Sequence, residues 1–145
     1  MQVPAEGPQV FVEPLPVSPG PHHGQWHAAW RVRNEGERPL ELLAAWCPHG
    51  RFRAPRWELS PPPRLLRGES AEVQTLVACD EAPGTVVENA FVIFQTRWGG
   101  EPWRVLVRLE IRAAAQGAPE NVAALITTQP IGFSRAGGTG PTEGC

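Results

Sequence analysis

The segment from Glu88 to Arg112 constrains the fold of this chain most, because its second half alternates apolar and polar residues over about ten positions. The residues of one face are all apolar: Trp103, Val105, Val107, Leu109 and Ile111. The opposite face carries Arg104, Arg108, Glu110 and Arg112, with Leu106 as its only apolar member. Successive side chains leave a β-strand in opposite directions, so this pattern predicts a strand with one buried face.

The first half of the segment is apolar on both faces at residues 90–94, which is typical of a central strand covered on both sides. Between the two halves, residues 98–102 read Trp-Gly-Gly-Glu-Pro. The glycines permit the positive φ angles of a tight turn. We therefore predict a long β-hairpin over Glu88–Arg112.

Residues 26–33, 40–47 and 71–79 alternate in the same way, and residues 34–39 have the composition of a turn. The first two segments are therefore predicted to pair as a hairpin, with Trp26 opposite Trp46 in the core and Cys47 on the outer face. Several short strands with turn signals between them, and no convincing helix, favour an all-β fold. We expect an antiparallel immunoglobulin-like (Greek-key) β-sandwich with Pro/Gly-rich flexible ends, and an up-and-down barrel is the structural alternative.

The length of 145 residues indicates one domain with flanking segments. Residues 1–21 are predicted to be a proline-rich N-terminal segment that includes an edge strand near residues 9–12. Residues 22–112 are predicted to form the β-sandwich. Residues 113–145 are predicted to be a linker and a largely disordered tail, in which residues 121–127 could form a short helix or strand.

The composition excludes several classes of protein. The net charge of −2 gives no sign of a polyanionic partner for the whole chain. No stretch reaches the roughly 18 consecutive apolar residues of a membrane span, and the first residues do not have a signal-peptide pattern. A cytoplasmic location is therefore expected. Three cysteines do not make a disulfide framework, and pairing of Cys47 with Cys79 stays open.

Three short motifs carry a resemblance to a known group. Residues 32–42 read Val-Arg-Asn-Glu-Gly-Glu-Arg-Pro-Leu-Glu-Leu, residues 65–70 read Leu-Leu-Arg-Gly-Glu-Ser, and residues 91–94 with 105–107 supply the closing hairpin. In these motifs the chain resembles bacterial immunoglobulin-like modules related to the hydin/abnormal-spindle and major-sperm-protein group. Arg67 stands where that group has proline. The resemblance implies a β-sandwich that binds partners or acts in assembly without catalysing a reaction.

A group of histidines and one cysteine is the candidate metal site: His23, His27, Cys47 and His49. Imidazole and thiolate ligands suit zinc or copper, and the predicted hairpin would bring these residues to one end. The spacing is not that of a standard zinc motif. Loop histidines and a half-buried free thiol are the structural interpretation of the same residues.

A second candidate site interleaves cations with an aromatic residue: Arg51, Arg53, Arg56 and Trp57. Single-stranded nucleic acid is bound by this combination, because bases stack on aromatic rings and phosphates pair with cations. The net negative charge and the use of arginine for every cationic side chain argue against it.

No catalytic residues are predicted. The sequence lacks a Gly-x-Ser-x-Gly motif, a P-loop, an HExxH motif and paired carboxylates at a strand end. The leading hypothesis is a non-catalytic module that binds another protein, with self-association through sheet edges as one form of assembly. The alternatives are a small metal-binding protein and a nucleic-acid-binding accessory protein. No cofactor is expected apart from zinc or copper under the metal hypothesis.

Overall fold

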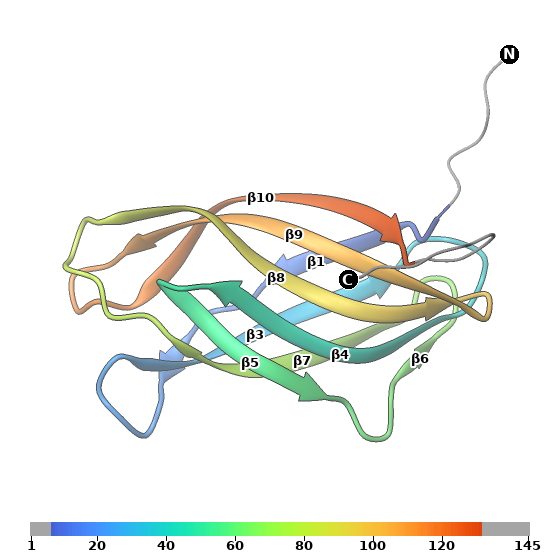
Figure 1. The fold of residues 1–145 in the computed structure, drawn as a ribbon, viewed down its shortest axis with the longest axis horizontal. Helices are drawn as coiled ribbons and strands as arrows, with labels where there is room; N and C mark the ends of the chain where they lie inside the picture. The colour runs from blue at the N-terminus through green and yellow to red at the C-terminus, as the bar shows by residue number, and fades with distance from the viewer. Residues whose placement is uncertain (1–6, 132–145) are drawn as a thin grey trace, which may run out of the picture.

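The computed structural model describes residues 7–131, which form a single antiparallel β-sheet (Figure 1). The ten strands are β1 (Val10–Pro14), β2 (Ser18–Pro19), β3 (Gln25–Asn34), β4 (Leu40–His49), β5 (Phe52–Glu58), β6 (Arg64–Leu65), β7 (Ser70–Ala78), β8 (Val86–Trp98), β9 (Glu101–Ala113) and β10 (Pro119–Pro130). The described residues contain no helix that is long and apolar enough to cross a membrane.

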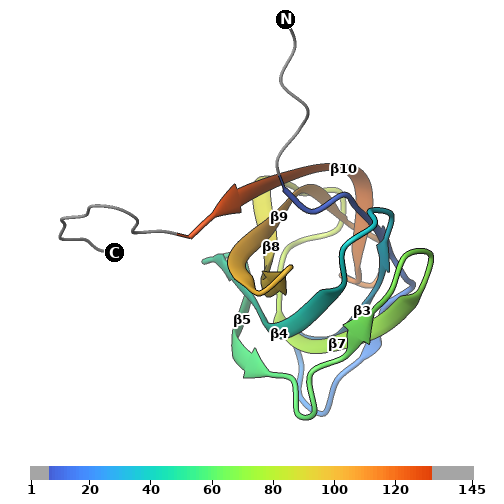
Figure 2. The ribbon, with the colours of Figure 1, turned by 90° about the vertical axis from the view of Figure 1, so that its right-hand side faces the viewer.

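The strands follow one another in the order β1-β3-β7-β5-β4-β8-β9-β10, with the short β2 on β3 and β6 on β4. Seen along the long axis, the sheet curls into a nearly closed barrel (Figure 2). The backbone pairing between neighbouring strands is minimal or absent at two places in the sheet. A single residue pair, Arg53 with Ala78, joins β5 to β7, and the terminal strands β1 and β10 do not pair with each other.

The predicted long hairpin is confirmed. Strands β8 and β9 pair from Val86 with Arg112 to Trp98 with Glu101, and Gly99 and Gly100 adopt φ angles of 55° and 86° at the turn. The inward residues of β9 are buried as the alternation predicted. They join a core whose largest fully buried members include Trp30, Phe52, Phe94, Leu40, Leu42, Leu109 and Ile111.

The predicted hairpin between residues 26–33 and 40–47 is wrong. Strand β3 pairs with β1, β2 and β7, whereas β4 pairs with β5, β6 and β8. The connection between them crosses from one part of the sheet to the other around Asn34, which is fully buried. Its side-chain amide donates to the carbonyl oxygens of Arg38 and Leu65, each at 2.9 Å, and its Oδ1 accepts from the Gly36 N–H at 3.0 Å.

The sheet continues beyond residue 112, where the β-sandwich was predicted to end. Strand β10 follows a short turn and pairs with β9 from Pro119–Ala113 to Pro130–Trp103. Its side chains are mostly exposed, so it is held by backbone pairing more than by burial. The predicted edge strand near residues 9–12 is present as β1. Of the segment 113–145 that was predicted to be a linker and tail, residues 132–145 lie outside the described residues.

Candidate interaction surface

A bulge in β4 decides which of its side chains reach the outer face of the sheet. Opposite β8, the register shifts between Leu42, which pairs with Thr96, and Ala44, which pairs with Gln95. One extra residue in a strand turns all the following side chains to the opposite face. Trp46 therefore shares the outer face with its partner Ile93, while Cys47 is fully buried. This reverses the predicted orientation of both residues.

Trp46 belongs to a row of side chains that crosses four strands. It pairs with Ile93 on β8, Ile93 pairs with Leu106 on β9, and Leu106 pairs with Thr127 on β10. In the next row, Phe91 pairs with Arg108, which pairs with Leu125. We call the apolar members of these two rows the outer apolar face: Trp46, Phe91, Ile93, Leu106 and Leu125.

The outer apolar face is partly accessible to solvent. Leu125 is 52% exposed, and the other four side chains are partly exposed. All five are aromatic or aliphatic residues on paired strands, and Ile93 lies directly beside both Trp46 and Leu106. A contiguous apolar surface of this kind marks a contact site more often than scattered exposed residues do.

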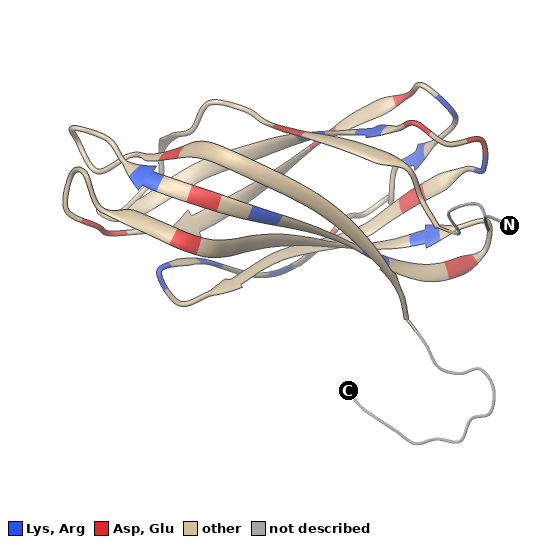
Figure 3. Cartoon of the chain, turned by 90° about the horizontal axis from the view of Figure 1, so that it is seen from above, with Lys and Arg blue, Asp and Glu red and all other residues tan. Residues whose placement is uncertain are grey.

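Arginine side chains flank the outer apolar face. The guanidinium carbon of Arg56 lies 5.0 Å from the centre of the Trp46 ring, and that of Arg104 lies 5.8 Å from it. Arg56 also forms an ion pair with Glu58. Within residues 7–131, neither Arg104 nor Arg108 forms a salt bridge, so each presents an uncompensated positive charge beside apolar side chains. Along the described strands and loops seen in Figure 3, basic and acidic residues are interspersed.

The four residues of the candidate metal site do not come together. The Nε2 atom of His23, in a loop, lies 3.3 Å from Oδ1 of Asp80. His27 is exposed on β3, where it pairs with Leu76 of β7. The Nδ1 atom of His49 accepts a hydrogen bond from the Arg51 backbone N–H at 3.0 Å. Within residues 7–131, no three His, Cys, Asp or Glu side chains are grouped so that they could hold a metal ion.

The two buried cysteines are free thiols. Cys47 pairs with Ala54 on β5, and the other edge of β5 pairs with Ala78, so β5 separates the two cysteines. Burial raises the pKa of the Cys47 thiol to about 12. The pKa of Cys79 is raised to about 11, first by burial and then by the negative charges of Glu81 and Asp80. Both thiols are therefore held in the unreactive protonated form at neutral pH.

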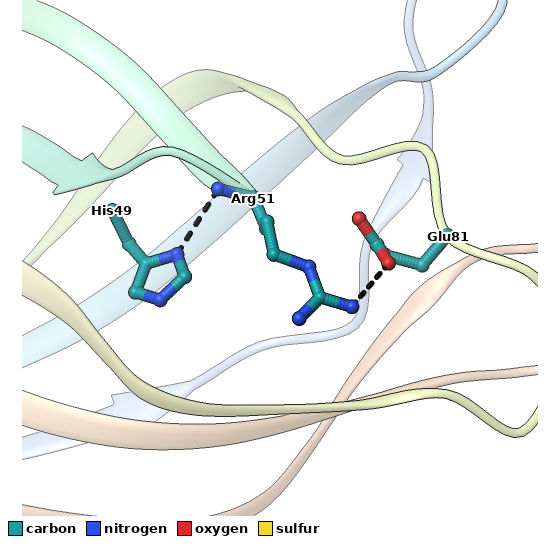
Figure 4. A network of polar contacts seen from close by, with 3 residues as sticks. All are labelled: His49, Arg51 and Glu81. Atoms are coloured by element: carbon teal, nitrogen blue, oxygen red, sulfur yellow. Dashed lines mark hydrogen bonds and ion pairs between the residues drawn. The ribbon is translucent and has the colours of Figure 1, made fainter.

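The candidate nucleic-acid residues lie along β5 and the turn before it, and two of them already pair with carboxylates. Arg51 donates to Glu81 at 2.6 Å (Figure 4), and Arg56 pairs with Glu58. The hydrogen bond from Arg51 lowers the pKa of the Glu81 carboxyl. Arg53 is exposed, and Trp57 is 61% exposed. The structure therefore places these three cations and the Trp57 ring along β5 and the turn before it, but two of the three cations pair with carboxylates.

The outer apolar face was missed as a site, although the sequence contains its signal. Leu106 interrupts an otherwise polar face, and residues 90–94 are apolar on both sides. These features predicted a doubly covered strand, whereas in the structure the outer side chains Phe91 and Ile93 stay partly exposed. In comparisons with known proteins, no family model, curated protein or solved structure matches this chain.

Proposed function

We propose that this protein is a non-catalytic immunoglobulin-like module that binds another protein through the outer apolar face. The single observation that carries the proposal is the row of partly exposed apolar side chains across β4, β8 and β9, with arginines on both sides. Binding regions at protein interfaces are enriched in Trp, aromatic residues and Arg, and their centres exclude charge.

The immunoglobulin-like part of the proposal is supported by the strand order. The weak junction between β5 and β7 divides the strands into a β1-β3-β7 group and a β5-β4-β8-β9-β10 group. Consecutive strands β3 and β4 belong to different groups, as in a Greek-key sandwich. The buried residues of both groups form one core cluster.

A protein partner fits this surface better than nucleic acid does. Base stacking needs free aromatic rings, but two guanidinium groups already lie close to the Trp46 ring. Of the other four side chains of the face, Phe91 is the one aromatic ring, and Ile93, Leu106 and Leu125 are aliphatic and offer no stacking platform. The net charge of −2 also gives little attraction for a polyanion.

The charges around the face define the chemistry of the partner. Arg104 and Arg108 form no ion pair with a carboxylate among the described residues, and they flank Leu106 along β9. A complementary surface has apolar side chains at its centre and Asp or Glu side chains at its edge. Charge complementarity of this kind contributes mainly to the association rate and to specificity.

The test is a comparison of two tryptophan variants in binding to a partner isolated from the cells that make this protein. Trp46→Ala removes the largest side chain of the face, and we expect it to weaken binding at least tenfold, which corresponds to about 1.4 kcal/mol. Trp57→Ala is the matched control, because Trp57 is more exposed but lies outside the face. Equal binding of both variants and the wild type would contradict the proposal.

A further inference from the structure

We propose that the free edge of β7 pairs with β7 of a second copy of this chain, which would give a symmetric dimer. Strand β7 ends the β1-β3-β7 group of strands, and only Ala78, at its last position, pairs with β5. The edge lies in the other group of strands from the outer apolar face. The two surfaces are therefore independent binding sites.

The hydrogen bonds at both ends of the β3–β7 ladder show which backbone groups of β7 are free. The Asn34 N–H donates to the Glu69 carbonyl, and the Cys79 N–H donates to the Gly24 carbonyl. In an antiparallel ladder, every second residue directs its N–H and C=O toward the partner strand. The odd-numbered residues of β7 therefore face β3. The N–H and C=O groups of the residues between them point away from β3: Ser70, Glu72, Gln74 and Leu76.

The other edges of the sheet carry features that discourage strand addition, and β7 does not. Strand β1 has five residues and ends in Pro14, and β5 contains Pro55. Strand β10 is interrupted by a bulge between Asn121 and Ala123. Prolines, bulges and short length are the usual protections of edge strands. Strand β7 has nine residues with no proline, glycine or bulge, and its single charged residue is Glu72.

The free edge of β7 is complementary to itself. An antiparallel pairing about a twofold axis at Val73 places Ser70 opposite Leu76 and Glu72 opposite Gln74 of the second copy. All four residues with free backbone groups then meet each other, so every ladder bond can form. No like charges lie directly opposite. Twofold symmetry of this kind is the commonest arrangement of soluble oligomers, and it is the reason to prefer a second copy over an unrelated strand.

The pair formed by Glu72 and residue 74 provides a sharp test, because the pair occurs twice in the dimer. Sedimentation velocity over a concentration series should show a monomer–dimer equilibrium for the wild type. Gln74→Lys would place a cation opposite each Glu72, and Gln74→Glu would place a carboxylate there. We expect Gln74→Lys to lower the dissociation constant of the dimer and Gln74→Glu to raise it, each by roughly twofold to thirtyfold. Thr127→Lys and Thr127→Glu on β10 are controls and should change nothing.

Three results would overturn the proposal. The first is a monomer at every concentration, and the second is an equal response to both substitutions at position 74. The third is a protein that stays monomeric but binds a synthetic peptide of residues 70–78, with the β7 amides then protected from hydrogen exchange. Such a result would mean that the edge accepts a free strand and not a second copy of the folded chain. Gln74 is exposed, so both variants should fold, and thermal unfolding checks this. Trp46→Ala should leave the dimer unchanged, which separates this test from that of the outer apolar face.

Discussion

Replacement of Asn34 by alanine should destabilise the fold strongly, because one buried side chain supports the whole connection between β3 and β4. The side chain makes three hydrogen bonds, with Gly36, Arg38 and Leu65. The bonds to Gly36 and Leu65 are buried, and the bond to Arg38 is partly buried. A buried polar group that is left without a hydrogen-bond partner destabilises the folded state by about 1–3 kcal/mol. Asn34→Ala removes the Asn34 partner of three backbone groups, so we expect it to lower the free energy of unfolding by about 3 kcal/mol.

The substitution Asn34→Asp tests which of these hydrogen bonds matter. The introduced carboxylate can still accept a hydrogen bond from the Gly36 N–H, but it cannot donate to the carbonyl oxygens of Arg38 and Leu65. It also places a negative charge against two carbonyl oxygens in a fully buried position. At neutral pH the order of stability should therefore be wild type, then Asn34→Ala, then Asn34→Asp.

Equilibrium unfolding in urea measures these differences, provided that the slope of the unfolding free energy with urea is unchanged. Asn121→Ala is the matched control, because the Oδ1 atom of Asn121 has no hydrogen-bond partner. We expect its effect to stay within about 0.5 kcal/mol. If Asn34→Ala lowered the free energy of unfolding by no more than about 0.5 kcal/mol, or if Asn34→Asp were more stable than Asn34→Ala, the hydrogen bonds of Asn34 would not be what stabilises the connection between β3 and β4.

Two further predictions follow from the shifted pKa values. Because Arg51 lowers the pKa of Glu81, the stabilising effect of the ionised carboxylate is present above its ordinary pKa of about 4.3 and is lost as the pH falls through the lowered value. Thermal unfolding should therefore show Glu81→Gln to be less stable than the wild type at pH 7 and equally stable at a pH below the lowered pKa of Glu81. A difference in stability that persists at that low pH would contradict the prediction. In a Cys145→Ser protein, a thiol reagent at pH 8 should label Cys47 and Cys79 only after unfolding, and rapid labelling of the native protein would show that they are not buried.

The alternation of side chains predicted strands well but did not predict their neighbours. A period of two residues says which side chains face the core, and the buried residues of β9 follow it. It does not say which strand lies alongside, so two strands adjacent in sequence, β3 and β4, were predicted to pair. Their separation depends on the buried hydrogen bonds of Asn34, and the composition of a turn does not distinguish a hairpin from a crossing.

For β10 the sequence did not decide between a short helix and a strand, and the physical reason is different. Its residues 122–128 read Val-Ala-Ala-Leu-Ile-Thr-Thr and do not alternate, because the strand lies at an edge with most of its side chains exposed. Backbone pairing with β9 holds such a strand, and backbone pairing leaves no periodic signal in side-chain polarity.

The candidate site was predictable in part. Leu106 and residues 90–94 already indicated apolar side chains on the outer side of the central hairpin. Trp46 could not be assigned to that side, because the bulge between Leu42 and Ala44 has no sequence signature such as glycine. The same bulge turns Cys47 into the core, and this removes one ligand from the predicted metal site.

The most direct test of the account compares two equally exposed positions as sites of photo-crosslinking. Leu125 on the outer apolar face is 52% exposed, and Phe11 on β1 is 51% exposed. With a photoreactive amino acid at each position in turn, the account predicts one defined crosslinked protein from position 125, lost in an Arg108→Glu background, and no such product from position 11. The same product from both positions, or a product insensitive to Arg108→Glu, would contradict the proposal that this face recognises a protein partner.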